Sequence, residues 1–264
     1  TGDTAFLRQE VPYYKGKKAP VFEHLLQGLK YIYARRGPNG LALLGGGDWN
    51  DSIGRFAGRD AESVLISQQL AYCTKLMTAL ARPLRRRDVV PWCRRVFRQM
   101  AEAVNGAGWD GKWYRTVLHA DPKDPPIGSA QRPELKLYPY NQSWAVISGT
   151  ATPERGVQAM DALWDLDVEP FGCRMGWPPA TGTPKPPAPL LTNFPGVGEN
   201  GGVFNQPCGW FVPAEATQGR GDQAFDMYRR CLPPVVSERV GMQRYGQESY
   251  CYASHLLAPP QAKP

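Results

Sequence analysis

The 264-residue sequence predicts an all-α fold in which helical hairpins are arranged as an α/α toroid. Three observations support this prediction. Apolar residues recur at helical spacing in three successive pairs of segments, and a short turn joins the two members of each pair. Glycines, prolines, acids and tryptophans gather in the connections between the pairs. The sequence shows no alternation of strands and helices of the kind that builds a parallel sheet.

The first helix is predicted to begin near Pro20 and to end at the turn formed by residues 37–40. A short apolar piece at residues 41–44 follows, and it leads into the glycine-rich segment 45–52. The apolar positions of the first helix are three or four residues apart, as on one helical face: Phe22, Leu25, Leu26, Leu29, Ile32 and Tyr33.

The first hairpin is expected to begin at Asp60, which we predict to cap a helix that continues to about residue 80. A basic turn at residues 82–87 leads into a second helix over residues 89–104, which a pair of glycines ends. Residues 109–119 alternate aromatic and polar side chains, a pattern that favours a short extended segment.

The second hairpin is predicted from a short apolar helix over residues 141–148 and a helix capped by Thr152, with Pro153 at its first position. After this hairpin, residues 178–189 contain six prolines in twelve positions. Because both flanks of this segment are apolar and aromatic, we expect a stiff loop at the mouth of a cleft. A disordered linker is the alternative.

The third hairpin is predicted from residues 210–217 and 222–232, with Pro233 and Pro234 ending its second helix. The last stretch, residues 243–257, shows no pattern of a final helix. The chain also opens directly on domain-like sequence at Thr1. We therefore expect a domain that is truncated at both ends.

The net charge of +7 raises the question of a nucleic-acid partner. The basic residues are scattered, however, and their densest run, residues 85–87, falls in the predicted turn of the first hairpin. No spacing typical of a nucleic-acid-binding motif occurs, so we interpret these residues as a solvated surface. No apolar run approaches the roughly 20 residues that cross a bilayer.

Six cysteines are spread along the chain without a C-x-x-C pair, and most of them stand among apolar residues. Free thiols in such surroundings behave as small hydrophobic side chains. We therefore expect no disulfide framework and a reducing, cytoplasmic compartment. The three histidines show no metal-ligand spacing, and no metal site is predicted.

The segment 45–52 has the composition of a catalytic loop, because three glycines precede Asp48, Trp49, Asn50 and Asp51. An indole face can cover the apolar face of a pyranose. The same apolar wall raises the pKa of a neighbouring carboxyl group, so that it can stay protonated and donate to a leaving oxygen. The alternative interpretation is a glycine-rich turn before a helix, with Asp48 or Asp51 as its cap.

A second stretch, residues 198–206, has the same character, since Glu199 and Asn200 lie among glycines and Gln206 ends it. In a toroid of hairpins, connections of this kind line one end of a central pocket. The sequence therefore predicts that the two loops meet across the ring, with the proton donor on one loop facing the other.

Seven stretches spread over nearly the whole chain carry a more specific signal: Thr1 to Asp3 with Phe6 and Leu7, residues 47–51 with 61–64, Trp113 and Tyr114, residues 127–129, residues 141–144 with 148 and 149, residues 195–204, and residues 247–250. In this order they resemble the inverting disaccharide phosphorylases of glycoside hydrolase family 94. That family includes cellobiose, cellobionic acid, laminaribiose and chitobiose phosphorylases and a domain of cyclic β-1,2-glucan synthases.

The resemblance implies that residues 1–264 form a catalytic (α/α)6 barrel domain that is incomplete in this chain. It also implies a reaction, in which phosphate attacks the anomeric carbon of a β-linked gluco-disaccharide or oligosaccharide and releases α-glucose 1-phosphate with inversion. Carried over by motif, Asp51 would be the general acid that protonates the glycosidic oxygen. Trp49 and Asn50 would shape the sugar and phosphate subsites. Because phosphate is already an anionic nucleophile, we expect neither a general base nor a cofactor.

The sequence departs from the family pattern at Gln206, where the family's phosphorylases usually have a histidine that contacts phosphate. A glutamine amide donates a hydrogen bond but carries no charge, and charge-assisted bonds are roughly twice as strong. An inverting hydrolase needs a second carboxylate about 6.5–9.5 Å from the acid, and Glu199 is the candidate. Alternatively, Glu199 fixes its glycine-rich loop through backbone N–H groups. Asn200 and Gln247 are further candidates for saccharide binding.

Three functions stay open on the sequence: the phosphorylase, an inverting hydrolase or transglycosylase-like relative with a weakened phosphate site, and a non-catalytic sugar-binding domain. The expected partners are a β-glucoside saccharide and phosphate, without nucleic acid or membrane. A homodimer is left open.

Overall fold

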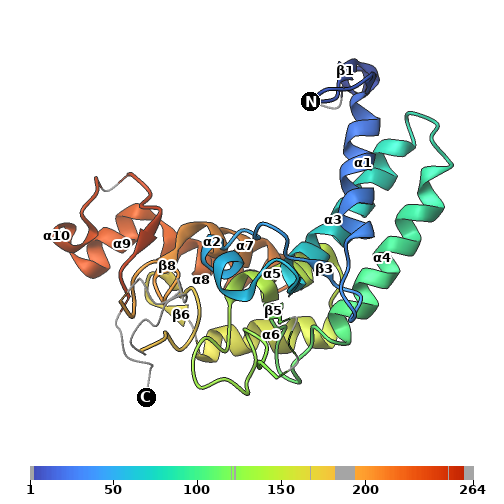
Figure 1. The fold of residues 1–264 in the computed structure, drawn as a ribbon. Coiled ribbons are helices and arrows are strands. Elements are labelled where there is room, and N and C mark those ends of the chain that lie inside the picture. The colour runs from blue at the N-terminus through green and yellow to red at the C-terminus, as the bar shows by residue number, and fades with distance from the viewer. Residues whose placement is uncertain are drawn as a thin grey trace.

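The computed structural model describes residues 3–119, 121, 123–166, 168–181, 194–248 and 250–258, and in them the chain is mainly helical (Figure 1). The helices are η1 (Ala5–Arg8), α1 (Val21–Ala34), α2 (Asp51–Ala57), α3 (Val64–Ala81), α4 (Val89–Asn105), α5 (Pro139–Ser148), α6 (Pro153–Leu166), α7 (Asn205–Thr217), α8 (Gly221–Cys231), α9 (Pro233–Val240) and α10 (Met242–Tyr245).

The strands are short and pair only with antiparallel neighbours. Two-stranded pairs are formed by β1 with β2, β6 with β7 and β8 with β9, and the order β3-β4-β5 makes one three-stranded sheet. Their bounds are β1 Glu10–Pro12, β2 Lys18–Pro20, β3 Ala42–Leu43, β4 Glu62–Ser63, β5 Val117–Leu118, β6 Val168–Glu169, β7 Gly172–Cys173, β8 Val203–Phe204 and β9 His255–Leu256.

The three predicted hairpins are confirmed as α3/α4, α5/α6 and α7/α8, which follow one another through the molecule in Figure 1. The first helices of the hairpins form an inner row, because α3 packs on α5 and α5 packs on α7. Burial agrees with this order: nine residues of α3 and eight residues of α5 are buried, against five of the 17 residues of α4. An amphipathic outer helix covers each inner one, as expected for an α/α arrangement.

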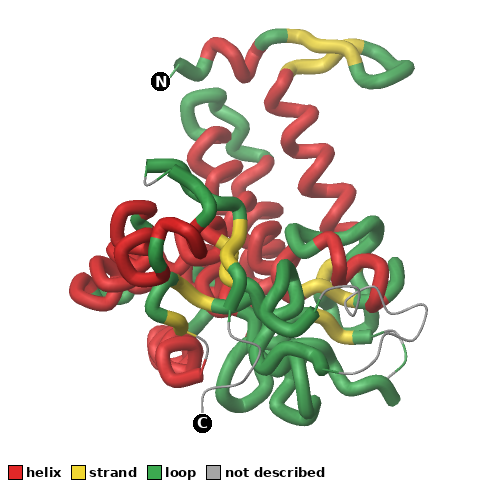
Figure 2. Tube along the Cα trace, turned by 90° about the vertical axis from the view of Figure 1, so that its left-hand side faces the viewer, coloured by secondary structure: helices red, strands yellow, loops and turns green. Residues whose placement is uncertain are grey.

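The connections differ in length at the two ends of the inner helices. Short turns lead from each inner helix to its outer partner, whereas the long segments 35–63, 106–138 and 167–204 lead into the inner helices α3, α5 and α7. The N-terminal ends of α3, α5 and α7 therefore share one end of the molecule with these long segments, and we name it the loop end. In Figure 2 most strands appear as short pieces within the loops, apart from the β1–β2 hairpin near the N-terminus.

The structure corrects three predicted helix boundaries. Helix α7 begins at Asn205, five residues before the start predicted at residue 210. The cap of α3 is Ser63, whose hydroxyl oxygen accepts from the backbone N–H of Ile66, and not Asp60. Residues 62 and 63 pair as β4 with two other strands, so the helix starts only after them. Pro233 and Pro234 follow the end of the third hairpin, as predicted, but they also form the first turn of a further helix, α9.

Two other expectations have different outcomes. The extended segment expected at residues 109–119 is confined to β5 and to an isolated bridge between Trp109 and Tyr114. The stiff proline-rich loop at residues 178–189 stays a prediction, because most of it lies outside the described residues.

Candidate active site at the loop end

The two loops singled out in the sequence meet at the loop end. The indole Nε1 of Trp49 donates a hydrogen bond of 2.8 Å to Oε1 of Gln206, across 157 positions of sequence. Around the indole lie the rings of Tyr140, Phe204 and Trp210, with centroid separations of 5.7, 5.7 and 5.4 Å. Because these rings belong to α5, β8 and α7, Trp49 joins the glycine-rich loop to two inner helices.

Asp51 is the first residue of α2, and its side chain is exposed. The cap of α2 is neither Asp48 nor Asp51 but Asn50, whose Oδ1 accepts from the backbone N–H of Ser52 at 3.1 Å. Asn50 itself is buried. Capping by the amide leaves the Asp51 carboxyl group free of a capping role, in the loop whose Trp49 meets the 198–206 loop.

Asp48 lies behind this segment and is held at both carboxylate oxygens. Oδ1 accepts from the backbone N–H of Asn50 at 2.9 Å, and Oδ2 accepts from the hydroxyl of Ser63 at 3.0 Å. Burial raises the pKa of Asp48 from 3.8 to about 6, against the lowering effect of these two hydrogen bonds, and the charge of Asp51 adds to the rise. Since both oxygens are occupied, Asp48 is poorly placed to protonate a substrate.

The 198–206 loop is held in place by the side chain of Asn200. Asn200 is buried, and its amide accepts from the N–H of Ala180 at 2.7 Å and donates to the carbonyl oxygen of Ala180 at 2.9 Å. Gly201 has φ of +89°, and a Cβ atom there would come within 2.7 Å of Pro179, so a side chain is excluded. Glu199 is partly buried in the turn just before Asn200.

Gln206 stands in the first turn of α7 and is exposed, with Oε1 engaged by Trp49. Gln247 is exposed in the turn that follows α10. Within the described ranges, no hydrogen bond or ion pair joins Gln247 to Trp49, Asp51 or Gln206. The structure thus brings residues 48–51 and 206 together, and it does not connect Gln247 to them.

Sequence reasoning missed a buried polar network between the N-terminal ends of α3 and α5. The side chain of Gln68 donates to the carbonyl oxygen of Asn141 at 2.9 Å, and Thr116 donates to Oδ1 of Asn141 at 2.8 Å. Gln142 both accepts from the N–H of Tyr114 and donates to its carbonyl oxygen. The available signal was the run of polar residues in an otherwise apolar helix, which a ladder of hydrogen bonds has to satisfy.

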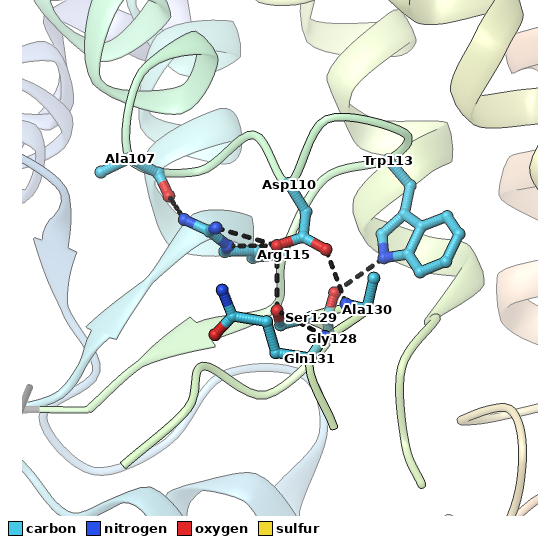
Figure 3. Close-up of polar contacts among 8 residues, drawn as sticks. All are labelled: Ala107, Asp110, Trp113, Arg115, Gly128, Ser129, Ala130 and Gln131. Carbon is cyan, nitrogen blue, oxygen red and sulfur yellow. Dashed lines mark hydrogen bonds and ion pairs between the residues drawn. The ribbon is translucent and has the colours of Figure 1, made fainter. Parts of the chain in front are cut away.

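A second missed feature is the clamp that closes the loop between α4 and α5 (Figure 3). The buried carboxylate of Asp110 accepts from Arg115 at 2.8 Å, from the hydroxyl of Ser129 at 2.9 Å and from the N–H of Ala130 at 2.6 Å. It therefore binds the two ends of a segment that leads into α5 at the loop end.

Replacement of Asp110 by Ala is expected to lower the free energy of unfolding by about 2–4 kcal/mol, because a partly buried guanidinium, a buried hydroxyl and a backbone N–H lose their acceptor. Urea denaturation measures the change. Asp124→Ala removes an exposed carboxylate from the same loop and should cost less than about 0.5 kcal/mol. Equal costs for the two variants would show that the clamp does not hold the loop.

The described residues contain neither a metal-binding cluster nor a membrane-spanning helix. Among the described residues, no three His, Cys, Asp or Glu side chains are grouped so that they could hold a metal ion. In the same part of the chain, no helix has both the length and the apolar character of a membrane span.

Comparison with known proteins places these features in a family. Residues 1–262 match the model of the Glycosyl hydrolase 94 superfamily, catalytic domain. The solabiose phosphorylase of Paenibacillus borealis is 32% identical, over 98% of this chain and 34% of the relative. The 3-O-beta-D-glucopyranosyl-beta-D-glucuronide phosphorylase of the same organism is 35% identical, over 88% of this chain and 30% of the relative. The cyclic beta-(1,2)-glucan synthase NdvB of Rhizobium meliloti is 31% identical, over 97% of this chain and 10% of the relative.

The chain spans about a third or less of the length of these curated relatives. Among solved structures, an uncharacterized conserved protein from Thermus thermophilus has the same fold, with a TM-score of 0.55 at 14% identity over 92% of this chain and 66% of that one. The family expected from the sequence is thereby confirmed: the chain belongs to the Glycosyl hydrolase 94 superfamily.

Proposed function

We propose that the chain is the catalytic domain of an inverting glycoside phosphorylase that acts on a β-linked gluco-disaccharide or oligosaccharide and releases α-glucose 1-phosphate. Membership of the family and the phosphorylase names of two relatives support this proposal. The observation that carries it is the hydrogen bond between Trp49 and Gln206, because it gathers the candidate acid loop and the candidate phosphate loop at one place.

In the proposed reaction, Asp51 gives its proton to the glycosidic oxygen as the bond to the anomeric carbon breaks. Phosphate attacks that carbon from the opposite face in the same step, so the configuration inverts. Phosphate is an anion at neutral pH and needs no base, and no cofactor is required. The exposed position of Asp51 at the start of α2 leaves its carboxyl group accessible to a sugar.

The remaining candidate residues have supporting parts in this proposal. Trp49 provides an indole wall beside the scissile bond, and Asn50 shapes the loop through its cap on α2. Asn200 keeps the facing loop in place from within, while Glu199 and Gln247 would bind the saccharide. Gln206 would donate its amide N–H to phosphate, since its Oε1 already accepts from Trp49.

The test is to incubate the intact gene product with a panel of β-glucobioses, with and without phosphate, and to assay glucose 1-phosphate. We expect the sugar phosphate only when phosphate is present. Binding of a saccharide without turnover under both conditions would instead indicate a sugar-binding domain.

A second candidate function is supported by Gln206, which carries no charge where a phosphate anion would bind. An inverting hydrolase or transglycosylase-like relative would release sugar at a rate independent of phosphate concentration. Glu199 would then be the base that activates water, and Glu199→Gln would abolish the release.

For the phosphorylase, Gln206→His is expected to lower the KM for phosphate about three- to tenfold, because an imidazolium donor strengthens the bond to the anion. The saccharide KM serves as the internal control and should change less than about twofold. Initial rates at varied phosphate concentration measure the effect. A phosphate KM that stays the same would remove Gln206 from the phosphate subsite.

A further inference from the structure

Asp48 has no part in the reaction proposed above, although it lies half-buried three residues before the candidate acid. Its two oxygens are bound to two different structural elements. One bond reaches Asn50, two residues further along the loop, and the other reaches Ser63, which is 15 residues away in β4. The carboxylate therefore links the glycine-rich loop to the end of a strand.

Ser63 is a firm anchor for such a link. Its hydroxyl has one hydrogen, which goes to Asp48, while its oxygen accepts from the N–H of Ile66 and so caps α3. Its carbonyl oxygen accepts from the hydroxyl of Ser67, and its backbone pairs with both neighbouring strands of the β3-β4-β5 sheet. The residue is fully buried at the N-terminus of an inner helix.

On the loop side, the Asp48 bond fixes the residue that precedes Asp51. The N–H of Asn50 is held by Asp48, the side chain of Asn50 caps α2, and its carbonyl oxygen accepts from the N–H of Ile53. The backbone N–H, the side-chain Oδ1 and the carbonyl oxygen of Asn50 are thus all bonded within the protein. As a result, the direction in which the Asp51 side chain leaves the backbone depends on where Asp48 holds residue 50.

We propose that Asp48 is the positioning residue of the candidate site: its carboxylate ties the backbone of Asn50 to the hydroxyl of Ser63 and thereby sets where Asp51 stands. The inference rests on the proposed function in one respect, namely that Asp51 is the acid. A proton donor has to be held close to the oxygen that it protonates, so a displacement of about 1 Å can cost on the order of 100-fold in rate.

The experiment uses the intact gene product with Asp48→Ala, Asp48→Asn, Ser63→Ala and Ser63→Thr. Asp48→Ala and Ser63→Ala each break the link, and kcat is expected to fall about 10- to 100-fold while the saccharide KM changes less than about threefold. Asp48→Asn and Ser63→Thr keep a hydrogen-bonding group at each position, and they should retain at least about a third of kcat.

Thr152→Ala is the matched control, because Thr152 accepts from the N–H of Arg155 at the start of the outer helix α6, at the end of the molecule opposite the loop end. Its loss removes a cap of the same kind and should leave kcat unchanged. Wild-type kcat in Asp48→Ala would overturn the proposal, and so would an equal loss in Asp48→Asn, since the charge and not the link would then matter.

Hydrogen exchange of the segment 48–57 gives a readout that needs no turnover. Faster exchange in Asp48→Ala and Ser63→Ala, with protection retained in the two conservative variants, supports the positioning role even if the protein makes no glucose 1-phosphate. In that case only the proposed function fails. Unchanged exchange in both alanine variants overturns the positioning role whatever the activity.

Discussion

Asp51→Asn is expected to reduce kcat for phosphorolysis of a β-glucobiose by about 10²- to 10⁴-fold, the range that general acid catalysis contributes. The amide has the size of the carboxyl group but has no acidic proton to give to the leaving oxygen. The saccharide KM should change little, because proton transfer is completed only as the bond breaks. Production of glucose 1-phosphate in the presence of phosphate measures the loss.

A substrate with a better leaving group separates loss of the acid from general damage. A nitrophenyl β-glucoside leaves as a stabilised phenolate that needs no proton, so Asp51→Asn should lose less than about tenfold with it. Asp60→Asn replaces another exposed aspartate of the connection 35–63, which also contains Asp51, and should keep wild-type rates with both substrates. Equal losses of Asp51→Asn on the two substrates would exclude Asp51 as the proton donor.

The helical hairpins could be predicted because each inner and outer helix carries its own apolar pattern, which needs only the local sequence. Helix boundaries depend on contacts that the local sequence does not show. Asp60 has the side chain of a good cap, but residues 62 and 63 are drawn into a sheet with segments before and after them, and the cap moves to Ser63. Pro233 is a similar case, since proline is common both at the start of a helix and just after its end.

The site was predictable to the extent that its residues are unusual for their surroundings. Trp49 and Gln206 lie in two glycine-rich stretches of similar character, and the structure joins them directly. The supporting contacts were not predictable. An aspartate in an irregular loop can bind its own turn or a distant hydroxyl with equal chemical reason, so neither the bond from Ser63 to Asp48 nor the clamp at Asp110 follows from spacing.

Asp48 should also make stability depend on pH in a way that one substitution reveals. Its pKa is about 6 in the folded protein and 3.8 as a free side chain, so the folded state binds its proton more tightly than the unfolded state. The ionised Asp48 carboxylate therefore lowers the free energy of unfolding. This destabilisation is absent below about pH 3.8, grows as the pH rises, and is complete above about pH 6. Since each pKa unit corresponds to about 1.4 kcal/mol, the full effect is about 3 kcal/mol.

Asp48→Asn removes the partly buried charge and keeps groups that can bond to Asn50 and Ser63. We therefore expect the variant to exceed the wild type in free energy of unfolding by up to about 3 kcal/mol at about pH 7–8, with the difference shrinking toward zero near pH 4. Urea denaturation at a series of pH values gives the difference curve, in which carboxylates shared by both proteins cancel. Asp60→Asn should show a flat curve within about 0.5 kcal/mol. A constant difference between about pH 4 and pH 8 for Asp48→Asn would mean that Asp48 titrates alike in both states, and that the carboxylate holding the loop is not desolvated.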